Sequence, residues 1–239
     1  MISKLTGTII LCVTFFVCTT STVISQQPDY SVIFGDDWKK ALDFVEENNS
    51  WIKPVLRKYN IPYEEAIAVV FPELVRYSAL RDRMEVVLLK TLYRNLGDEY
   101  ADFSVGVFQV KPSFAEKIIG ESKGTRTGGV FKARNEFPND YQFRANIIAE
   151  LEDPVKEFRF VIAFIKICEK KFSIPVDEVS KISFLATAYN TGFWKSEEEI
   201  KMMSDKKFFN TKLFKTENYS YAEVSLSWYN HYLESNNNQ

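Results

Sequence analysis

The sequence predicts an all-α protein. Apolar residues recur at three- and four-residue steps through most of the chain, as they do along the buried face of an amphipathic helix. No convincing run of alternating apolar and polar residues indicates a β-strand. The 9 glycines in 239 residues lack the even spacing of a repeat protein. A composition that is 46% hydrophobic and 26% charged is typical of a globular chain.

The first 25 residues resemble a secretory signal peptide. Lys4 precedes an apolar run at 9–17, and residues 23–25 form a cleavage tripeptide. The run is too short to span a bilayer core of about 30 Å. Cys12 and Cys18 also lack the small preceding residue that lipoprotein processing favours. We therefore expect an exported protein that acts in the periplasm or at the cell envelope.

Removal of this segment restricts the available chemistry. It leaves Cys168 as the only thiol and His231 as the only imidazole, so an internal disulfide and a His- or Cys-rich metal site are excluded. A Ser-His or Cys-His mechanism would have to use His231, close to the C-terminus. The formal charge changes from −2 to −3 with the loss of Lys4, and no basic cluster indicates a nucleic acid partner. We expect no metal and no cofactor, and chemistry that uses carboxyl, amide and hydroxyl groups.

Each helix has a local justification. Acidic residues open the segment 36–47, as the helix dipole favours, and Pro154 suits the first turn of the next long helix. Gly192 is placed to end the helix before it. Helices are expected at 36–47, from Pro62 onward, within 81–100, and at 113–119, 154–172, 176–189 and 221–233.

These elements predict four parts: a signal peptide at 1–25, an N-terminal helical segment at 26–59, a main helical domain at 60–235 and a disordered tail at 236–239. One connection is unusual. The polar segment 120–139 contains four of the nine glycines and is long for a loop inside a compact domain. Both a functional lid and a disordered loop remain open for it.

The helix that begins near Pro62 carries the first candidate for chemistry. Pro72 lacks a backbone N–H and is expected to end or kink this helix. Glu73 would then stand at the break, directly after the apolar run 66–71. Burial beside apolar residues raises the proton affinity of a carboxyl group, which a general acid requires.

Two later segments offer further polar groups. In GVFQVKP (106–112), Gly106 permits a close approach of the backbone, and the Gln109 amide both donates and accepts hydrogen bonds. In AYNTG (188–192), a helix of small residues ends in Tyr-Asn before a glycine. Each segment alone also fits an ordinary reading, a turn before a helix in the first case and a capped helix in the second.

In this order, the segments IPYEEAIAVVFPEL, GVFQVKP and AYNTG resemble the lytic transglycosylases of the soluble type, which are relatives of goose-type lysozyme. The resemblance covers residues 60–192. It implies a lysozyme-like helical domain with a glycan-binding groove and without a cofactor. It also implies peptidoglycan glycan strands as the partner and leaves room for an envelope protein complex.

The resemblance also implies a role for each residue. Glu73 would protonate the oxygen of the β-1,4 bond between N-acetylmuramic acid and N-acetylglucosamine, and would then act as the base. The product would be a 1,6-anhydro-muramic acid end. Gln109 would bind sugar amides, and Gly106 would let the backbone close on the glycan. Tyr189 would orient Glu73 or the 2-acetamido group, and Asn190 would fix the turn or contact sugar.

Aromatic residues would supply surfaces on which sugars stack, although aromatic residues at helical spacing more often belong to the core. Tyr77 and Phe108 lie beside the two polar segments and are the first candidates. The others are Tyr93, Tyr100, Phe103 and Trp194.

The sequence departs from the family pattern and leaves other functions open. Leu74 stands where the family has Ser after the catalytic Glu, so Tyr77 or Ser78 would have to replace its hydrogen bond. The interval from Glu73 to Gln109 is also long, with an extra helix within it. These departures indicate a divergent subfamily.

A lysozyme-like hydrolase is one alternative, and it would use a second carboxylate. The candidates for that carboxylate are Asp98, Glu99 and Asp102. An inactive peptidoglycan-binding or scaffold protein on the same fold is another alternative. A helical protein-protein module with chance motifs is a third.

Overall fold

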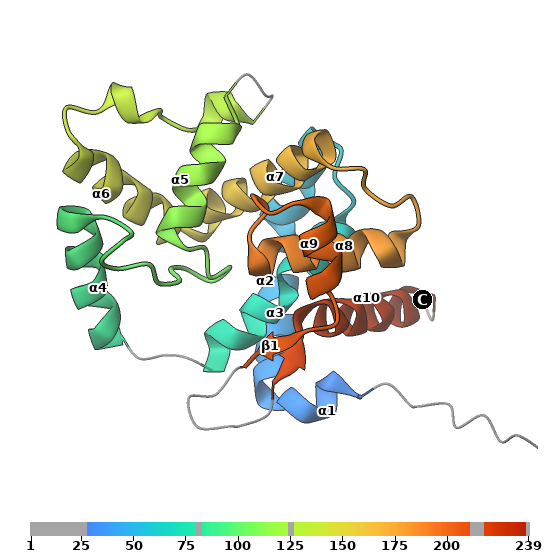
Figure 1. Cartoon of the computed structure of the whole chain (residues 1–239). Coiled ribbons are helices and arrows are strands. Elements are labelled where there is room, and N and C mark those ends of the chain that lie inside the picture. Colours follow the sequence, from blue (N-terminus) through green and yellow to red (C-terminus); the bar gives the residue numbers. More distant parts are fainter. Residues whose placement is uncertain (1–27, 80–82, 124–126, 211–217, 238–239) are drawn as a thin grey trace, which may run out of the picture.

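The computed structural model confirms a mostly helical protein (Figure 1). The structure describes residues 28–79, 83–123, 127–210 and 218–237, so the expected signal peptide lies outside the described residues. The elements are α1 (Tyr30–Phe34), α2 (Asp36–Tyr59), α3 (Tyr63–Ala79), α4 (Arg83–Leu96), α5 (Pro112–Glu121), η1 (Gly128–Val130), η2 (Arg134–Glu136), α6 (Asp140–Leu151), α7 (Pro154–Lys171), α8 (Glu178–Thr191), α9 (Glu197–Met203), β1 (Lys207–Phe209), β2 (Tyr219–Ser220) and α10 (Tyr221–Asn237). Strands β1 and β2 pair in an antiparallel arrangement.

Helix α3 is the centre of the fold. It contacts α2, α7, α8 and α10, and its residues 66–71 have no exposed surface. Phe71 lies between two indole rings, with centroids 4.7 Å from Trp38 of α2 and 5.5 Å from Trp228 of α10. The N-terminal helices therefore share one core with the rest of the chain. Figure 1 shows α4, α5 and α6 on one side of α3 and α8, α9 and α10 on the other.

The expected break at Pro72 is wrong. Helix α3 continues through Pro72 and ends at Ala79. A proline inside a helix removes one hydrogen bond, and packing on several sides can offset that loss. Because α3 is surrounded by four helices, it stays helical, and Glu73 lies inside a continuous helix rather than at its end.

Other helix boundaries also differ from the expectation. Helix α2 is longer than 36–47 and runs through Pro54, and α10 extends to Asn237, two residues into the expected tail. Helices α6 and α9 were not expected. The seven-residue α9 buries only Ile200, so it leaves almost no periodic signal.

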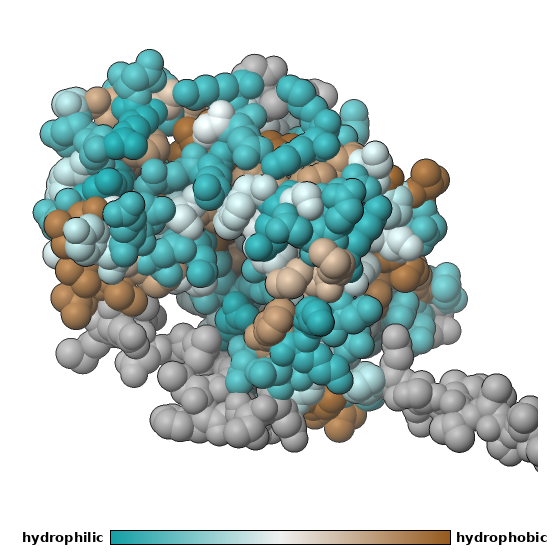
Figure 2. Space-filling model, in the orientation of Figure 1, coloured by the Kyte–Doolittle hydropathy of each residue, from teal (hydrophilic) through white to brown (hydrophobic). Residues whose placement is uncertain are grey.

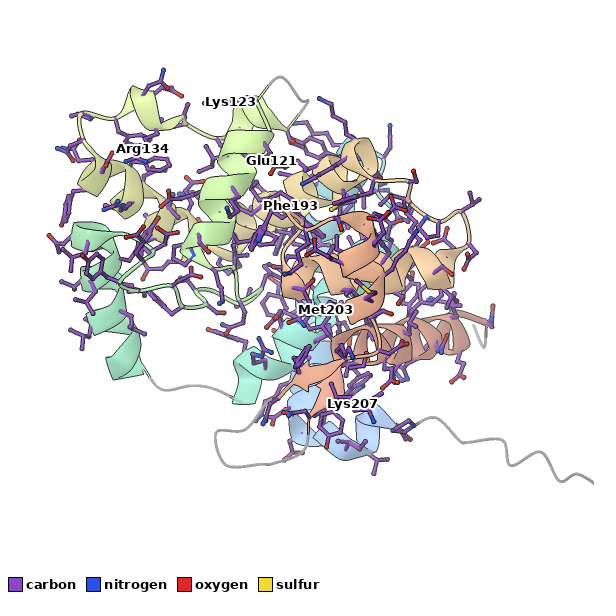
Figure 3. The ribbon with its side chains drawn as sticks, in the orientation of Figure 1. Glu121, Lys123, Arg134, Phe193, Met203 and Lys207 are labelled. Carbon is purple, nitrogen blue, oxygen red and sulfur yellow. The ribbon has the colours of Figure 1, made fainter. Side chains whose placement is uncertain are left out.

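The described part of the segment 120–139 contains the end of α5 and the short helices η1 and η2, and it packs on α7. The Phe131 ring packs on Phe160 with centroids 4.5 Å apart, and Arg134 forms an ion pair with Asp140 at the start of α6. Arg134 lies at the upper left of Figure 3, away from α3 and α8. The described part of this segment lines a pocket with α2 and α7, separate from the candidate site below.

Hydrophilic residues dominate the face in Figure 2, and a hydrophobic patch appears at the lower left over α4. Val87 and Leu88 of α4 are 63% and 61% exposed. Among the described helices, none combines the length and the apolar character needed to span a membrane.

The position of Phe71 gives a test of this core. We expect Phe71→Ala to lower the free energy of unfolding by about 3–5 kcal/mol, because it opens a cavity between two tryptophans. Exposed Val87→Ala is the control and should change stability by less than about 0.5 kcal/mol. Urea unfolding followed by tryptophan fluorescence measures both. Equal effects of the two substitutions would contradict the packing of α2 and α10 on α3.

Candidate functional site

A pocket of about 300 Å³ brings together all three segments that the sequence singled out. Glu73 and Arg76 come from α3, Gln109 and Lys111 come from the loop before α5, and residues 189–192 come from the end of α8. The volume is at the small end of ligand pockets, which span roughly 300–1,000 Å³. The pocket therefore has room for a small ligand, and its polar groups converge from separate parts of the chain.

Glu73 is the buried carboxyl group of this pocket, with 4% of its surface exposed. Its Oε1 accepts a hydrogen bond of 3.3 Å from Nη1 of Arg76, and its Oε2 lies 3.1 Å from the same nitrogen. Oε2 accepts no hydrogen bond from the described residues. Burial raises the pKa of Glu73 above its ordinary value, and the positive charges of Arg76 and Lys111 oppose this rise.

A tyrosine from α10 brings a hydroxyl group near Glu73. Leu74, which follows Glu73, is 3% exposed and belongs to the core. The hydroxyl of Tyr221 is close enough to Glu73 to oppose the rise in the pKa of that carboxyl group. The same hydroxyl lies 3.1 Å from the carbonyl oxygen of Val69, to which it can donate. Burial raises the pKa of Tyr221 well above its usual value, so it stays protonated.

The loop 105–110 is organised around a second buried carboxyl group, that of Glu157 at the start of α7. Oε2 of Glu157 accepts a hydrogen bond of 2.8 Å from the N–H of Val107, and Oε1 accepts from Phe108 (3.0 Å) and Val110 (3.4 Å). Glu157 has no exposed surface. Burial raises the pKa of Glu157 well above its ordinary value, while the three N–H groups favour the ionised form.

This arrangement changes the expected roles of Gly106 and Phe108. A Cβ atom on Gly106 would lie 2.2 Å from Oε2 of Glu157 and 2.3 Å from the carbonyl oxygen of Leu151. The close approach at Gly106 is thus to the protein interior and not to a glycan. Phe108 has no exposed surface and packs on Phe158 at 5.0 Å, so its ring is not available for stacking on sugar.

Gln109 faces the pocket with a strained backbone. Its φ of 53° lies in the left-handed region, where residues other than glycine are uncommon. Its Nε2 donates a 2.7 Å hydrogen bond to the carbonyl oxygen of Gly106. That bond fixes the orientation of the Gln109 side chain. The oxygen of its amide can still accept a hydrogen bond from a ligand.

Tyr189 connects α8 to this loop. Its hydroxyl donates a 2.9 Å hydrogen bond to the carbonyl oxygen of Phe108 and not to Glu73, which was one of the two partners that the resemblance implied. Its ring packs on Phe114 of α5 and Phe164 of α7, with centroids 5.3 and 5.2 Å away. Phe193, labelled in Figure 3, extends this cluster, because its ring centroid lies 5.1 Å from that of Phe114 and 5.9 Å from that of Phe164. Tyr189 therefore positions the loop through a neutral hydroxyl.

Asn190 and Trp194 lie at the pocket itself. Trp194 is 42% exposed, and Nζ of Lys117 lies 4.9 Å from the centre of its ring. A Cβ atom on Gly192 would lie 2.4 Å from this indole, so glycine is required for the tryptophan to take its place. Trp194 offers a partly exposed flat surface next to polar groups, which suits a sugar ring.

The structure does not bring the remaining candidates into the pocket. Tyr77 is 38% exposed one turn after Glu73 but does not line the pocket, and neither do the other aromatic candidates apart from Trp194. Of the three acidic residues proposed for a hydrolase, only Asp102 lines it. Its carboxylate lies 3.6 Å from Nζ of Lys111 and accepts the N–H of Ser113.

Three residues of the site were missed by the sequence analysis. Arg76 looked like an ordinary surface residue of a helix, and Tyr221 is distant in the chain from the other segments. Glu157 did have a detectable signal, because it continues the buried stripe of Val161, Phe164 and Cys168 at helical spacing. A carboxyl group on such a stripe must have internal donors.

The described residues contain no cluster of three or more His, Cys, Asp or Glu side chains that could hold a metal ion. Cys168 is a buried thiol inside α7, and burial raises its pKa well above the ordinary value. A buried protonated thiol is a poor nucleophile.

Comparison with known proteins gives no relative: no family model matches the sequence, and no curated protein or solved structure matches it. The functional interpretation therefore depends on the residues and on the geometry of the pocket.

The three hydrogen bonds to Glu157 lead to a test of the loop. In Glu157→Gln an amide NH₂ replaces one acceptor oxygen and faces a backbone N–H. We expect a loss of about 1–3 kcal/mol in the free energy of unfolding, because a buried N–H loses its acceptor. Glu169→Gln, on the exposed side of the same helix, should change stability by at most about 1 kcal/mol. Chemical denaturation measures both, and a neutral effect at 157 would contradict the role of this carboxylate.

Proposed function

We propose that the protein is a peptidoglycan lytic transglycosylase that uses Glu73 as its general acid and base. The observation that supports this most is the meeting of Glu73, Gln109, Tyr189 and Asn190 around one pocket. These residues come from three segments separated by up to 117 positions, in the order in which the family has them. A chance occurrence of short motifs would not require them to meet.

The environment of Glu73 suits proton transfer to a glycosidic oxygen. Its burial disfavours the ionised form and raises the pKa of the carboxyl group. In the first step the acid form would protonate the leaving oxygen of the β-1,4 bond. In the second step the carboxylate would take the proton of the 6-hydroxyl group of the muramic acid residue, which then closes the 1,6-anhydro ring. No water molecule is consumed.

Other pocket residues would bind and orient the glycan. The oxygen of the Gln109 amide can accept a hydrogen bond from an N-acetyl N–H, and Asn190 can both donate and accept. Trp194 would stack on a sugar ring. Tyr189 would act indirectly, since its hydroxyl supports the loop that carries Gln109.

A hydrolase is the nearest alternative, and Asp102 is the carboxylate in the pocket that could assist a water molecule. However, Asp102 already pairs with Lys111 and caps the N–H of Ser113, which is a structural role. An inactive glycan-binding protein would use the same pocket without cleavage. The digestion below separates all three functions.

Digestion of purified peptidoglycan tests the proposal. We expect soluble fragments with 1,6-anhydro-muramic acid ends, identified by mass spectrometry. Glu73→Gln should reduce the rate by about 10²-fold or more while glycan binding persists, because the amide cannot transfer a proton. Reducing ends would indicate the hydrolase instead. Binding without cleavage by the unmodified protein would indicate the binding protein.

The charge of Lys111 gives a prediction about pH. Glu73 must be protonated to act as the acid, so activity should fall as the pH rises through its raised pKa. Lys111→Gln removes a positive charge that lowers this pKa, and the alkaline limb of the pH–kcat profile should therefore move to higher pH. Lys166→Gln, which removes an exposed lysine on α7 paired with Glu169, should leave the limb in place. A shift to lower pH in Lys111→Gln would contradict the assignment of Glu73.

A further inference from the structure

We propose that Arg76 binds a carboxylate group of the substrate, and that this carboxylate replaces Glu73 as the partner of the guanidinium. The proposal rests on the proposed function and defines its substrate more closely: a glycan that carries a negative charge next to the bond that is cleaved. The carboxylate would belong to the lactyl group of a peptide-free muramic acid or to an attached peptide.

The position of Arg76 is the first argument. It lies one turn after Glu73 on α3 and lines the same pocket. Its guanidinium stacks over the ring of Phe209 of β1 with 4.7 Å between its carbon and the ring centre. Stacking of this kind holds a guanidinium in place and leaves its edge free for hydrogen bonds. The side chain is 21% exposed, against 5% for Glu73, so it is the more accessible of the two groups.

The use of its donors is the second argument. A guanidinium has five N–H groups in a planar fork that matches a carboxylate. Within the part of the chain that the structure describes, the only hydrogen-bond acceptor of Arg76 is the Glu73 carboxylate, through Nη1. The donors on Nε and Nη2 therefore remain for a ligand that enters the pocket.

The third argument comes from the charge on Glu73. As long as Glu73 is ionised, it neutralises Arg76 at 3.1 Å. Once Glu73 is protonated for catalysis, Arg76 is a partly buried cation that no other carboxylate of the described residues pairs with, which is unfavourable. A substrate carboxylate restores the balance. Binding of the anion and protonation of Glu73 are then linked, so that the substrate itself converts Glu73 into the acid.

The other charged and titratable groups around Glu73 do not take this role. Lys111 of the loop before α5 pairs with Asp102. The hydroxyls of Tyr189 on α8 and Tyr221 on α10 remain protonated, since burial and the charge of Glu73 raise their pKa values. Glu157 on α7 is saturated by three backbone N–H groups. Arg76 is thus the cation of this pocket whose partner changes during the reaction.

Calorimetry with short ligands tests the inference without cleavage. The disaccharide of N-acetylglucosamine linked to N-acetylmuramic acid carries a free lactyl carboxylate but lacks the scissile bond. The neutral comparison ligand is the disaccharide of two N-acetylglucosamine units. We expect the charged disaccharide to bind about ten-fold more tightly or better, because the bond to a carboxylate is charge-assisted. Titrations in two buffers that differ in ionisation enthalpy should show proton uptake with the charged ligand alone.

Variants identify the residue responsible. Arg76→Gln should lose the preference for the charged ligand and the proton uptake, but it should bind the neutral ligand as before. Lys166→Gln, which removes an exposed lysine of α7 outside the pocket, is the control and should keep both the preference and the uptake. Glu73→Gln should keep the preference but lose the uptake. Thermal unfolding of each variant checks that it is folded. The comparison of ligands on the unmodified protein tests the inference even if a variant does not fold.

Two further ligands locate the carboxylate. One is the same disaccharide with its lactyl group converted to a methylamide, and the other carries a stem peptide with free carboxylates. Preference for the free lactyl group identifies a peptide-free strand, and preference for the peptide form places the anion on the peptide. Equal affinity for all four ligands would overturn the inference, even if the protein cleaves peptidoglycan. Absence of both glycan binding and cleavage would overturn the proposed function as well.

Discussion

The carboxylate of Glu157 is the interaction on which the candidate site depends. It lies inside the protein and accepts three N–H groups from a single short loop. That loop presents Gln109 to the pocket and supplies the carbonyl oxygen to which Tyr189 donates. Because a buried carboxyl group without donors is costly, α7 and the loop must be assembled together. Through this one side chain, the core determines where the polar groups of the pocket lie.

The sequence was sufficient for those parts of the structure that have a local signal. The helical class and the long helices follow from apolar spacing, and Glu73, Gln109, Tyr189 and Asn190 were each identified from short motifs and meet in one pocket. Features that depend on contacts between distant segments could not be predicted from the sequence alone. The continuity of α3 through Pro72 requires the four helices around it.

The roles of individual aromatic rings also depended on packing. Phe108 and Trp194 are both aromatic residues beside a motif, yet one is fully buried and the other is 42% exposed. Net charge was equally uninformative about the site. A chain with a formal charge of −2 holds two cations and two carboxyl groups around this pocket, so its local field depends on which carboxyl groups are ionised.

The left-handed backbone of Gln109 has a consequence for how this chain can vary. Glycine adopts such a conformation without strain, whereas a side chain there costs stability. If only the shape of the loop mattered, selection for folding stability would favour glycine at this position. The long amide therefore places a polar group at the pocket at a cost in folding stability, and glycine at this position would give a more stable loop without that group.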